Sequence, residues 1–360
     1  MPIFQLENSR ISEFYEMHEP KVLKREILVN AHAELTIIQS RQTISNIING
    51  HDSRKLIICG PCSIHNRTAA LDYAYELNQL RLKYQDELFI VMRVYFEKPR
   101  TRIGWKGFIN DPKLNGTHDM CAGLYSARDL LAQIVSIGLP VATEWLDTIT
   151  PHYLGDLVSI GMIGARTTES QVHRQLVSGM SMPVGFKNNI AGDVQVACDA
   201  VASANNIHTF LGTSDEGKVA RIQTRGNSDC FIVLRGSSHG PNYSDSHVSD
   251  ATSLAKATGV NTRIVIDCSH GNSKKDYKNQ PMVFDNVASQ MIRNSNVVGL
   301  MIESNIHEGS QPLNTDPLRY GVSITDSCIS LQTTKELFEH FYWTLQIEKA
   351  PAMVEDIASA

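Results

Sequence analysis

The sequence predicts an α/β chain folded as a (β/α)8 TIM barrel, and three regularities support this prediction. Eight short, continuously apolar runs recur along the chain, which is typical of parallel strands covered on both faces. Helical patterns fall between most of these runs. A polar or ionisable residue also stands at the C-terminal end of each run. Because one closed barrel takes about 200 to over 400 residues, a chain of 360 residues fits a single barrel.

The first 50 residues precede the first apolar run and fit none of the strand-helix units. They contain a mixed-charge segment, 13–26, and a helical pattern, 31–48, that ends at Asn49-Gly50. We therefore divide the chain into an N-terminal extension, residues 1–50, and a barrel, residues 51–350. We expect the extension to pack on the barrel or on a neighbouring subunit.

The first strand-helix unit shows the pattern most clearly. The apolar run Lys55-Leu56-Ile57-Ile58-Cys59 is broken by Gly60-Pro61, which predicts a buried strand ending in a turn. A helical segment follows over residues 68–84, with apolar residues near i, i+3, i+4 spacing. The predicted strands, in order, are 55–60, 88–95, 140–146, 162–166, 183–188, 231–236, 263–268 and 297–303. The later helices are predicted at 121–137, 151–159, 169–180, 193–204, 249–257, 282–293 and 326–347.

Two insertions interrupt this rhythm. The loop 96–120, rich in Gly, Asn, Asp, Lys and Arg, is too long for an ordinary connection, which indicates an active-site loop. The segment 207–224 has two short strand-like runs around Ser214-Asp215-Glu216-Gly217, which predicts a β-hairpin added to the barrel.

Composition excludes several classes of protein. The net charge is −5 and the pI about 6.2, so the chain lacks the basic field that nucleic acid or an anionic membrane would require. No apolar run reaches the roughly 18 residues of a membrane span, and the N-terminal residues lack a signal-peptide layout. The seven cysteines are odd in number and widely scattered. We therefore expect a chain of the reducing cytoplasm.

If the fold is a barrel, the reacting groups belong at the C-terminal ends of the strands and in the loops that follow. Charged residues at the ends of apolar runs are seldom left unpaired, so we interpret them as one site. The residues at these positions are Cys62, Arg93, Lys98, Glu144, Arg166, Lys187, Arg235, Asp267, His270, Glu303 and Asp326.

Four of these side chains could hold a metal ion. Cys62, His270, Glu303 and Asp326 offer a thiolate, an imidazole and two carboxylates. This mixed set suits a borderline divalent ion such as Mn, Fe, Co or Zn. Each residue alone also has a structural reading, since Cys62 could be a small buried residue and the two carboxylates could begin helices.

Five cations form the second set at the same mouth of an otherwise acidic protein. Guanidinium groups bind phosphate and carboxylate bidentately, so a small substrate bearing both groups is the expected occupant. The alternative is that some cations pair with nearby acids, most readily the first of them. The set consists of Arg93, Lys98, Arg166, Lys187 and Arg235.

The segment Cys59-Gly60-Pro61-Cys62 has the C-x-x-C form of a dithiol redox site. Against this reading, Cys59 falls inside the apolar strand and the chain is far larger than a thioredoxin-like unit. The redox reading predicts turnover of a disulfide substrate that is indifferent to chelators.

Seven segments of the chain have the pattern of one enzyme family, namely 59–65 (CGPCSIH), 92–101 (MRVYFEKPRT), 104–107 (GWKG), 163–171 (IGARTTESQ), 184–188 (VGFKN), 267–272 (DCSHGN) and 323–326 (SITD). Through them the chain resembles the type I 3-deoxy-D-arabino-heptulosonate 7-phosphate (DAHP) synthases, over about residues 40–345. The resemblance implies a (β/α)8 barrel, a divalent metal, and condensation of phosphoenolpyruvate with erythrose 4-phosphate as the first step of the shikimate route to aromatic amino acids.

Carried over by position, the resemblance assigns the metal to the four residues named above and phosphoenolpyruvate to the five cations, and Ala165 is a further expected substrate-binding residue. Arg100 and Thr101 would meet the sugar phosphate. Glu144 would place a water and Lys98 would give a proton. The residues expected to act in catalysis are Lys98, Glu144, His270 and Asp326. The loop Asn189-Ile190-Ala191-Gly192 departs from the family pattern, which leaves its shape open.

The hairpin and the extension resemble the elements by which family members sense phenylalanine, tyrosine or tryptophan, and the resemblance implies a homo-oligomer, dimer or tetramer. Gly212 leaves room where some members carry serine, which favours tyrosine as the effector. The alternative for these residues is ordinary core packing. The implied effector pocket consists of Pro151, Leu176, Met180, Ser181, Phe210, Gly212 and Ile222.

The sequence leaves two alternatives to the function implied by the resemblance. A synthase of the same chemistry could use another aldose, such as arabinose 5-phosphate, although Lys98-Pro99-Arg100-Thr101 favours the four-carbon sugar. A catalytically silent amino-acid sensor could keep the barrel for its hairpin. That reading predicts lost metal ligands, and all four candidates are present.

Overall fold

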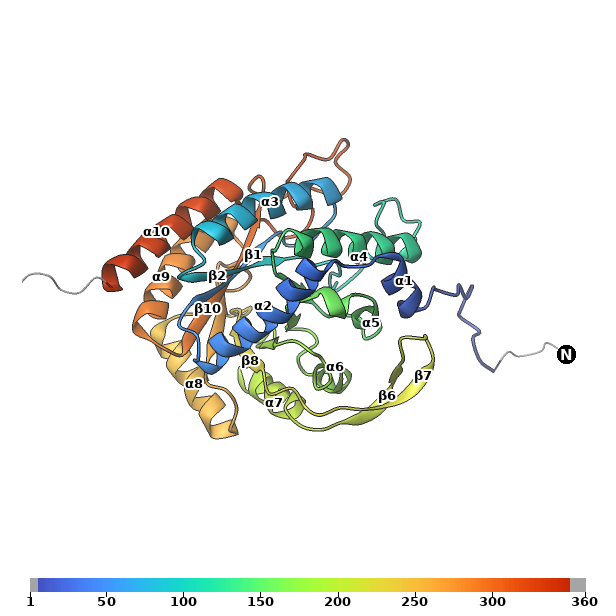
Figure 1. Cartoon of the computed structure of the whole chain (residues 1–360), viewed down its shortest axis with the longest axis horizontal. Coiled ribbons are helices and arrows are strands. Elements are labelled where there is room, and N and C mark those ends of the chain that lie inside the picture. The colour runs from blue at the N-terminus through green and yellow to red at the C-terminus, as the bar shows by residue number, and fades with distance from the viewer. Residues whose placement is uncertain (1–5, 350–360) are drawn as a thin grey trace, which may run out of the picture.

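The computed structural model describes residues 6–349 and shows a closed barrel of eight parallel strands (Figure 1). The barrel closes because β1 pairs with β2 on one side and with β10 on the other. The predicted TIM barrel is therefore confirmed. The barrel strands are β1 (Lys55–Gly60), β2 (Leu88–Arg93), β3 (Val141–Glu144), β4 (Ile160–Ile163), β5 (Val184–Lys187), β8 (Cys230–Leu234), β9 (Ile264–Asp267) and β10 (Val297–Asn305).

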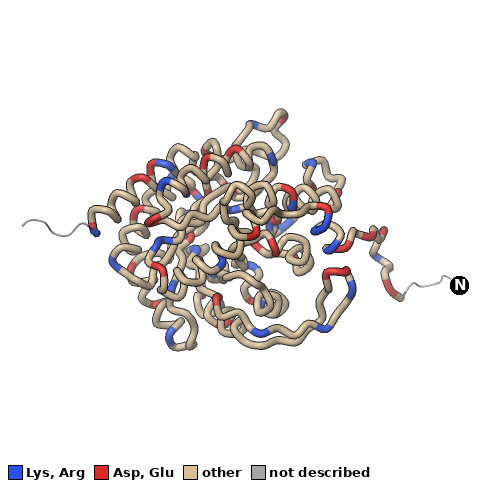
Figure 2. The backbone as a smooth tube through the Cα atoms, viewed as in Figure 1, with Lys and Arg blue, Asp and Glu red and all other residues tan. Residues whose placement is uncertain are grey.

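Helices surround the barrel and carry the chain from one strand to the next (Figure 1). Figure 2 shows Lys and Arg positions interspersed with Asp and Glu positions along the chain. The connecting helices are α3 (Arg67–Lys83), α4 (Met120–Ser136), α5 (Thr150–Leu154), α6 (Gln171–Val177), α7 (Gln195–Ala204), α8 (Asp245–Thr258), α9 (Gln280–Arg293) and α10 (Leu331–Lys349), with short 3-10 helices at Gly155–Leu157 and Tyr277–Asn279.

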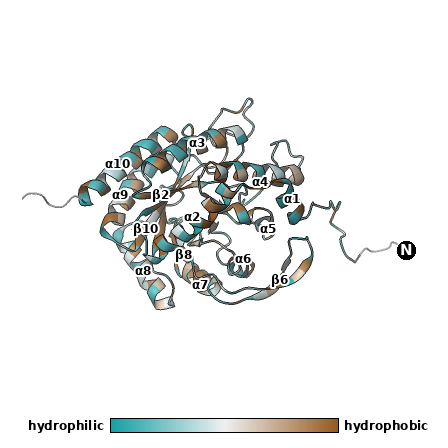
Figure 3. Ribbon diagram, in the orientation of Figure 1, coloured by the Kyte–Doolittle hydropathy of each residue, from teal (hydrophilic) through white to brown (hydrophobic). Residues whose placement is uncertain are grey.

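The strands divide the apolar core into two layers. In β1, Leu56 and Ile58 pack inside the barrel, whereas Ile57 and Cys59 pack in the layer between strands and helices. This alternation follows from the two-residue period of a strand. Because both layers are buried, the strands read as continuous apolar runs in the sequence, and hydrophobic ribbon is visible among the strands in Figure 3.

Helix α2 (Ala31–Asn49) closes the N-terminal end of the barrel. Its residues Ile44, Ile47 and Ile48 belong to the inner apolar layer. The helix begins with a cap in which Asn30 accepts from the backbone N–H of Ala33, and it ends at Gly50 in the left-handed conformation. With this end closed, the C-terminal ends of the strands form the open mouth.

The predicted hairpin is present as an antiparallel pair, β6 (Thr209–Thr213) and β7 (Val219–Gln223). Helix α1 (Pro20–Glu26) reaches its turn, because the N–H of Lys21 donates to the carbonyl of Asp215 at 2.9 Å. Lys24 also pairs with Asp215 at 3.1 Å. The extension is therefore tied to the hairpin across the sequence.

The start of the last predicted helix is wrong. Helix α10 begins at Leu331, after the short strand β11 (Ile329–Ser330), which pairs with the end of β10. The hydroxyl of Ser330 accepts from the N–H of Thr333 at 3.1 Å and so fixes the helix start. Asp326 therefore lies in the loop after β10, at the mouth, instead of beginning a helix.

Among residues 6–349, none of the helices combines the length and apolar character needed to span a lipid bilayer. All seven cysteines are free thiols. The division into an extension, 1–50, and a barrel domain, 51–350, stays a prediction. Residues 1–5 and Ala350 of those two ranges lie outside the described residues.

Candidate active site

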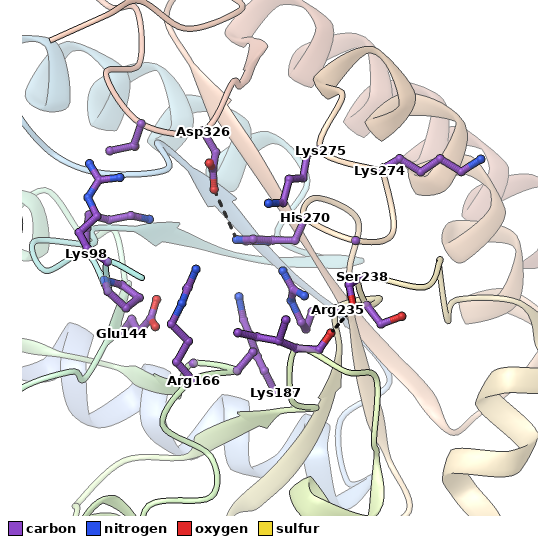
Figure 4. A pocket seen from close by; sticks show the side chains of 18 of the residues that line it. Lys98, Glu144, Arg166, Lys187, Arg235, Ser238, His270, Lys274, Lys275 and Asp326 are labelled. Carbon is purple, nitrogen blue, oxygen red and sulfur yellow. Dashed lines mark hydrogen bonds and ion pairs between the residues drawn. The ribbon is translucent and has the colours of Figure 1, made fainter. Parts of the chain in front are cut away.

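A cavity of about 560 Å³ opens at the C-terminal mouth of the barrel (Figure 4). Its walls come from the ends of successive strands and the loops after them, so residues far apart in sequence face one space. Seven Lys or Arg residues border it against two carboxylates, Glu144 and Asp326. The predicted site residues that line it are Lys98, Arg100, Glu144, Ala165, Arg166, Lys187, Arg235, His270 and Asp326.

Three of the four predicted metal ligands come together. The Sγ of Cys62 and carboxylate oxygens of Glu303 and Asp326 all lie within 4.8 Å of one another. Cys62 and Glu303 are buried, whereas the Asp326 side chain is 60% exposed at the mouth. A thiol and two carboxylates at this separation make a donor set for a divalent cation.

His270 stands beside this group. Its Nε2 lies 3.7 Å from Oε1 of Glu303 and 4.0 Å from Oδ2 of Asp326. Its Nδ1 faces Oδ2 of Asp267 at 2.9 Å and the hydroxyl of Ser269 at 2.7 Å. A carboxylate behind one ring nitrogen orients the other nitrogen toward a metal, as in many metalloproteins.

The charges around Cys62 fit a bound cation. Burial, and after it the Glu303 carboxylate, raises the pKa of the Cys62 thiol to about 12. A divalent cation supplies the positive charge that brings such a thiol to its thiolate form. The Nζ of Lys98 donates to the Sγ of Cys62 at 3.2 Å and to its carbonyl at 3.1 Å. Burial would lower the pKa of Lys98, but the charges of Cys62 and Glu303 hold it above its ordinary value.

Arg93 does not border the cavity. It is fully buried, its Nη2 donates to Oε1 of Glu303 at 3.0 Å, and its guanidinium lies 3.9 Å from the ring centre of Tyr95. The contacts are those of a residue that holds a metal ligand in place. The sequence reading had left this pairing open, and the predicted contact with phosphoenolpyruvate stays a prediction.

The other cations face the cavity. In Figure 4 the side chains of Arg166, Lys187 and Arg235 lie side by side with their nitrogens toward its centre. The Nζ of Lys187 donates to Oδ2 of Asp267 at 2.8 Å, whereas Arg166 and Arg235 have no ion pair within residues 6–349. Their positive charges are therefore available to an anion.

Glu144 approaches the chain after β4 closely. A Cβ placed on Gly164 would lie 2.1 Å from Oε1 of Glu144, so only glycine leaves this space for the carboxylate. Thr101, in the long loop, accepts from Nη2 of Arg166 at 3.3 Å, and Arg100 is held by a bond from Nε to the carbonyl of Trp105 at 2.8 Å. The loop therefore folds back over the mouth.

Comparison with known proteins identifies the family of this chain. The model of the family described as "DAHP synthetase I family" matches residues 29–339. The chain belongs to this family. The predicted resemblance is thereby confirmed, and the matched region includes every barrel strand together with the hairpin.

Members of the DAHP synthetase I family that resemble this chain include two enzymes of Escherichia coli (strain K12). The "Phospho-2-dehydro-3-deoxyheptonate aldolase, Tyr-sensitive" is 47% identical, covering 94% of this chain and 96% of that protein. The Phe-sensitive aldolase is 46% identical, with 93% and 96% covered. A solved structure of the aldolase from Francisella tularensis SCHU S4 has a TM-score of 0.92 and 45% identity, covering 94% of this chain and 99% of that one.

A second cavity in this chain, of about 640 Å³, lies between the barrel helices and the hairpin. It is mostly apolar, and Lys24, Arg41, Asp156 and Asp215 add charged groups at its border, beside the imidazole of His152. Burial lowers the pKa of His152. All seven residues of the predicted effector pocket line this cavity, namely Pro151, Leu176, Met180, Ser181, Phe210, Gly212 and Ile222.

The sequence reading missed several residues of the first cavity. They lie in loops rather than at strand ends, so the strand-end rule could not find them. A signal was available in the lysine pair that follows His270 by four and five positions. The missed residues are Ile190, Ser237, Ser238, His239, Lys274, Lys275 and Thr325.

Proposed function

We propose that the chain condenses phosphoenolpyruvate with erythrose 4-phosphate and water to DAHP and phosphate, using one divalent metal ion at the mouth of the barrel. Cys62, His270, Glu303 and Asp326 would hold the ion. The observation that carries the proposal is the meeting of a thiol and two carboxylates within 4.8 Å, beside a cavity bordered by cations. Membership in the DAHP synthetase I family supports the choice of reaction.

The donor set suits Mn, Fe, Co or Zn, because it combines one soft sulfur with nitrogen and oxygen ligands. A bound ion would act as a Lewis acid on the aldehyde carbonyl of the sugar. Arg93 neutralises Glu303 from behind, and Asp267 orients His270, so two ligands are held by buried partners. These contacts fix the site before any substrate binds.

The chain's own residues then perform the remaining steps. C3 of phosphoenolpyruvate attacks the aldehyde carbon, and the buried, protonated Lys98 gives a proton to the new alkoxide. Attack leaves positive charge at C2 of phosphoenolpyruvate, and water held by Glu144 adds there and gives one proton to the Glu144 carboxylate. The C–O bond to phosphate then breaks, the hydroxyl at C2 gives its proton to the departing phosphate and becomes the ketone, and Arg166 and Arg235 stabilise the departing charge.

The second cavity would bind an aromatic amino acid that inhibits the reaction. Apolar side chains such as Leu176, Phe210 and Ile222 would contact the aromatic ring, and the charged groups at the border would meet the ammonium and carboxylate. The relatives do not decide the effector, because the Tyr-sensitive and Phe-sensitive enzymes are 47% and 46% identical. The room expected beside Gly212 is already occupied, because a Cβ placed there would lie 2.4 Å from Cδ1 of Ile222, so Gly212 does not favour tyrosine.

A homo-oligomer and a place in the cytoplasm are further parts of the proposal. Exposed apolar residues of the extension, Phe14 at 76% and Tyr15 at 79%, support contact with a neighbouring subunit.

The test is release of inorganic phosphate from the two substrates, after treatment with EDTA and add-back of single metals. We expect activity to vanish with the chelator and return with Mn, Fe, Co or Zn. Arabinose 5-phosphate in place of the four-carbon sugar is the matched control. Faster turnover of the five-carbon sugar, or full activity in EDTA, would contradict the proposal.

A further inference from the structure

Lys275 is a cation of the first cavity that the reaction above does not use. Its backbone N–H donates to the carbonyl of His270 at 2.7 Å, and His270, Lys274 and Lys275 have φ of 55°, 55° and 62°. Left-handed conformations at residues other than glycine are uncommon and are often associated with a site. The turn brings the Lys275 side chain back toward the candidate metal ligands.

Figure 4 separates the two neighbouring lysines. The amino end of Lys275 lies beside Asp326 and His270, whereas the amino end of Lys274, which also borders the cavity, points away from these two residues. Both residues are exposed, so neither is needed for the core. The sequence alone does not distinguish them.

The cations of the cavity fall into two groups. Arg166, Lys187 and Arg235 lie together on one side of His270, as Figure 4 shows. On the other side, Lys275 lies next to Asp326, as Figure 4 shows, and Arg100 also borders the cavity. Neither of these two cations forms an ion pair within 4.0 Å in the part of the chain that the structure describes. Each therefore has charge free for a ligand.

The proposed reaction brings two phosphate groups into one cavity of about 560 Å³. Two dianions of this kind repel one another, so they need separate cationic sites. The group around Arg166 serves phosphoenolpyruvate in the proposed function. We infer that Lys275 is a further substrate-binding residue, which holds the phosphate of the aldose phosphate together with Arg100. This inference rests on the proposed function.

The experiment compares Lys275→Met with Lys274→Met in the metal-loaded full chain, by phosphate release with each substrate varied in turn. A charge-assisted hydrogen bond contributes about 1.5–3 kcal/mol. We therefore expect Lys275→Met to raise KM for erythrose 4-phosphate about 10- to 100-fold, with kcat and KM for phosphoenolpyruvate within about twofold. Lys275→Arg should recover most of the loss. Lys274→Met removes the same charge one residue earlier and should change KM less than about twofold.

Equal effects of the two methionine variants would show that only the general positive charge at the mouth matters, and not a direct contact between Lys275 and the sugar phosphate. That result would overturn the inference. An unchanged KM for the sugar phosphate in Lys275→Met would also overturn it. A circular-dichroism spectrum and thermal midpoint equal to the parent's establish that each variant is folded. If the unaltered enzyme releases no phosphate, the proposed function fails instead, so the two failures are distinguishable.

Discussion

The two cavities are similar in size and opposite in chemistry. The first holds about 560 Å³ and is bordered by charged residues at the ends of barrel strands, whereas the second holds about 640 Å³ and is mostly apolar. The first cavity is formed by the strands of the barrel and the loops that follow them. The second needs the hairpin, which has no counterpart in a plain barrel. In the proposed function, catalysis therefore depends on the barrel itself, and binding of the regulator depends on an addition to it.

This difference shows in how side chains are held. At the first cavity, Lys187 pairs with Asp267 and Arg93 pairs with Glu303, and all four side chains are at most 4% exposed. At the second, the pair of Lys24 and Asp215 is 25% and 52% exposed. A buried ion pair loses several kcal/mol when one partner is removed, whereas an exposed pair contributes about 0–1 kcal/mol. Substitutions should therefore damage turnover at the first cavity and regulation at the second.

The largest expected effect is at Cys62. Cys62→Ala removes the sulfur donor, and we expect kcat with Mn to fall at least about 1,000-fold, since an incomplete ligand set cannot hold the ion that activates the aldehyde. Metal content after gel filtration, measured by mass spectrometry, should fall in parallel. The matched control is Cys59→Ala, the same change at a buried thiol that bonds to Tyr73 outside the barrel interior.

That pair of variants also tests the dithiol alternative. A C-x-x-C redox site would lose activity with either cysteine, whereas a metal site tolerates loss of Cys59. We expect Cys59→Ala to retain metal and turnover within a few-fold, with some loss of stability. Equal inactivation of both variants at full metal content would contradict the proposed site.

A smaller effect is expected at Gly164. In Gly164→Ala the new methyl group would lie 2.1 Å from Oε1 of Glu144, so the carboxylate must move. We expect kcat to fall about 10- to 100-fold, which is the usual consequence of displacing a positioned group by about 1 Å. Binding of metal should not change. Steady-state kinetics measure the loss, and unchanged kcat would remove Glu144 from the proposed mechanism.

At the second cavity, a substitution should change inhibition more than it changes turnover. Ile222→Ala removes part of the apolar wall, and we expect the inhibitory concentration of the aromatic amino acid to rise about tenfold, from the loss of about 1–2 kcal/mol of apolar contact. Uninhibited kcat should stay within about twofold. Arg221→Ala is the matched control, because Arg221 is exposed and does not line the cavity. Assays with phenylalanine, tyrosine and tryptophan then identify the effector.

Much of the frame could be predicted from sequence, because both faces of a barrel strand are buried. The run 55–60 predicted β1 with the observed bounds, and the hairpin was found from its two short runs. The predicted strand 162–166 instead begins at Ile160, since a continuous apolar run does not mark where pairing with neighbours starts. Helix 326–347 was misplaced because a serine cap and a two-residue strand leave little pattern.

The predicted site residues agree with the lining of the first cavity at strand ends, and the prediction missed lining residues that lie in loops. Glu144 and Lys187 are the last residues of their strands, so the strand alone places them at the mouth. Lys275 is placed by a turn with three positive φ values, which no periodicity reports. Arg93 reads as a pocket cation in the sequence, and only the fold shows it behind Glu303.

One hydrogen bond connects residues that are next in sequence to lining residues of the two cavities, and we expect its loss to have the smallest effect. Glu97 precedes Lys98 of the first cavity, and its Oε2 accepts from the hydroxyl of Thr150 at 3.0 Å. Thr150 lies between Ile149 and Pro151, which line the second cavity. We expect Thr150→Val to leave kcat within about threefold and to weaken inhibition by the aromatic amino acid two- to fivefold, because a bond of about 1 kcal/mol is lost. Unchanged inhibition would show that the hydrogen bond between Glu97 and Thr150 does not couple the two cavities.

The same glutamate makes stability depend on pH. Burial, reinforced by Asp147, raises the pKa of Glu97 from 4.5 to about 7, so the folded chain binds the proton more tightly than the unfolded chain. The stabilisation is complete below pH 4.5 and is lost as pH rises through 7. Glutamine in Glu97→Gln cannot ionise, so the free energy of unfolding of this variant should fall less than that of the parent as the pH rises. The difference between the two falls is up to about 3 kcal/mol. Urea unfolding at pH 5 and pH 8 measures this, and parallel pH profiles for parent and variant would refute it.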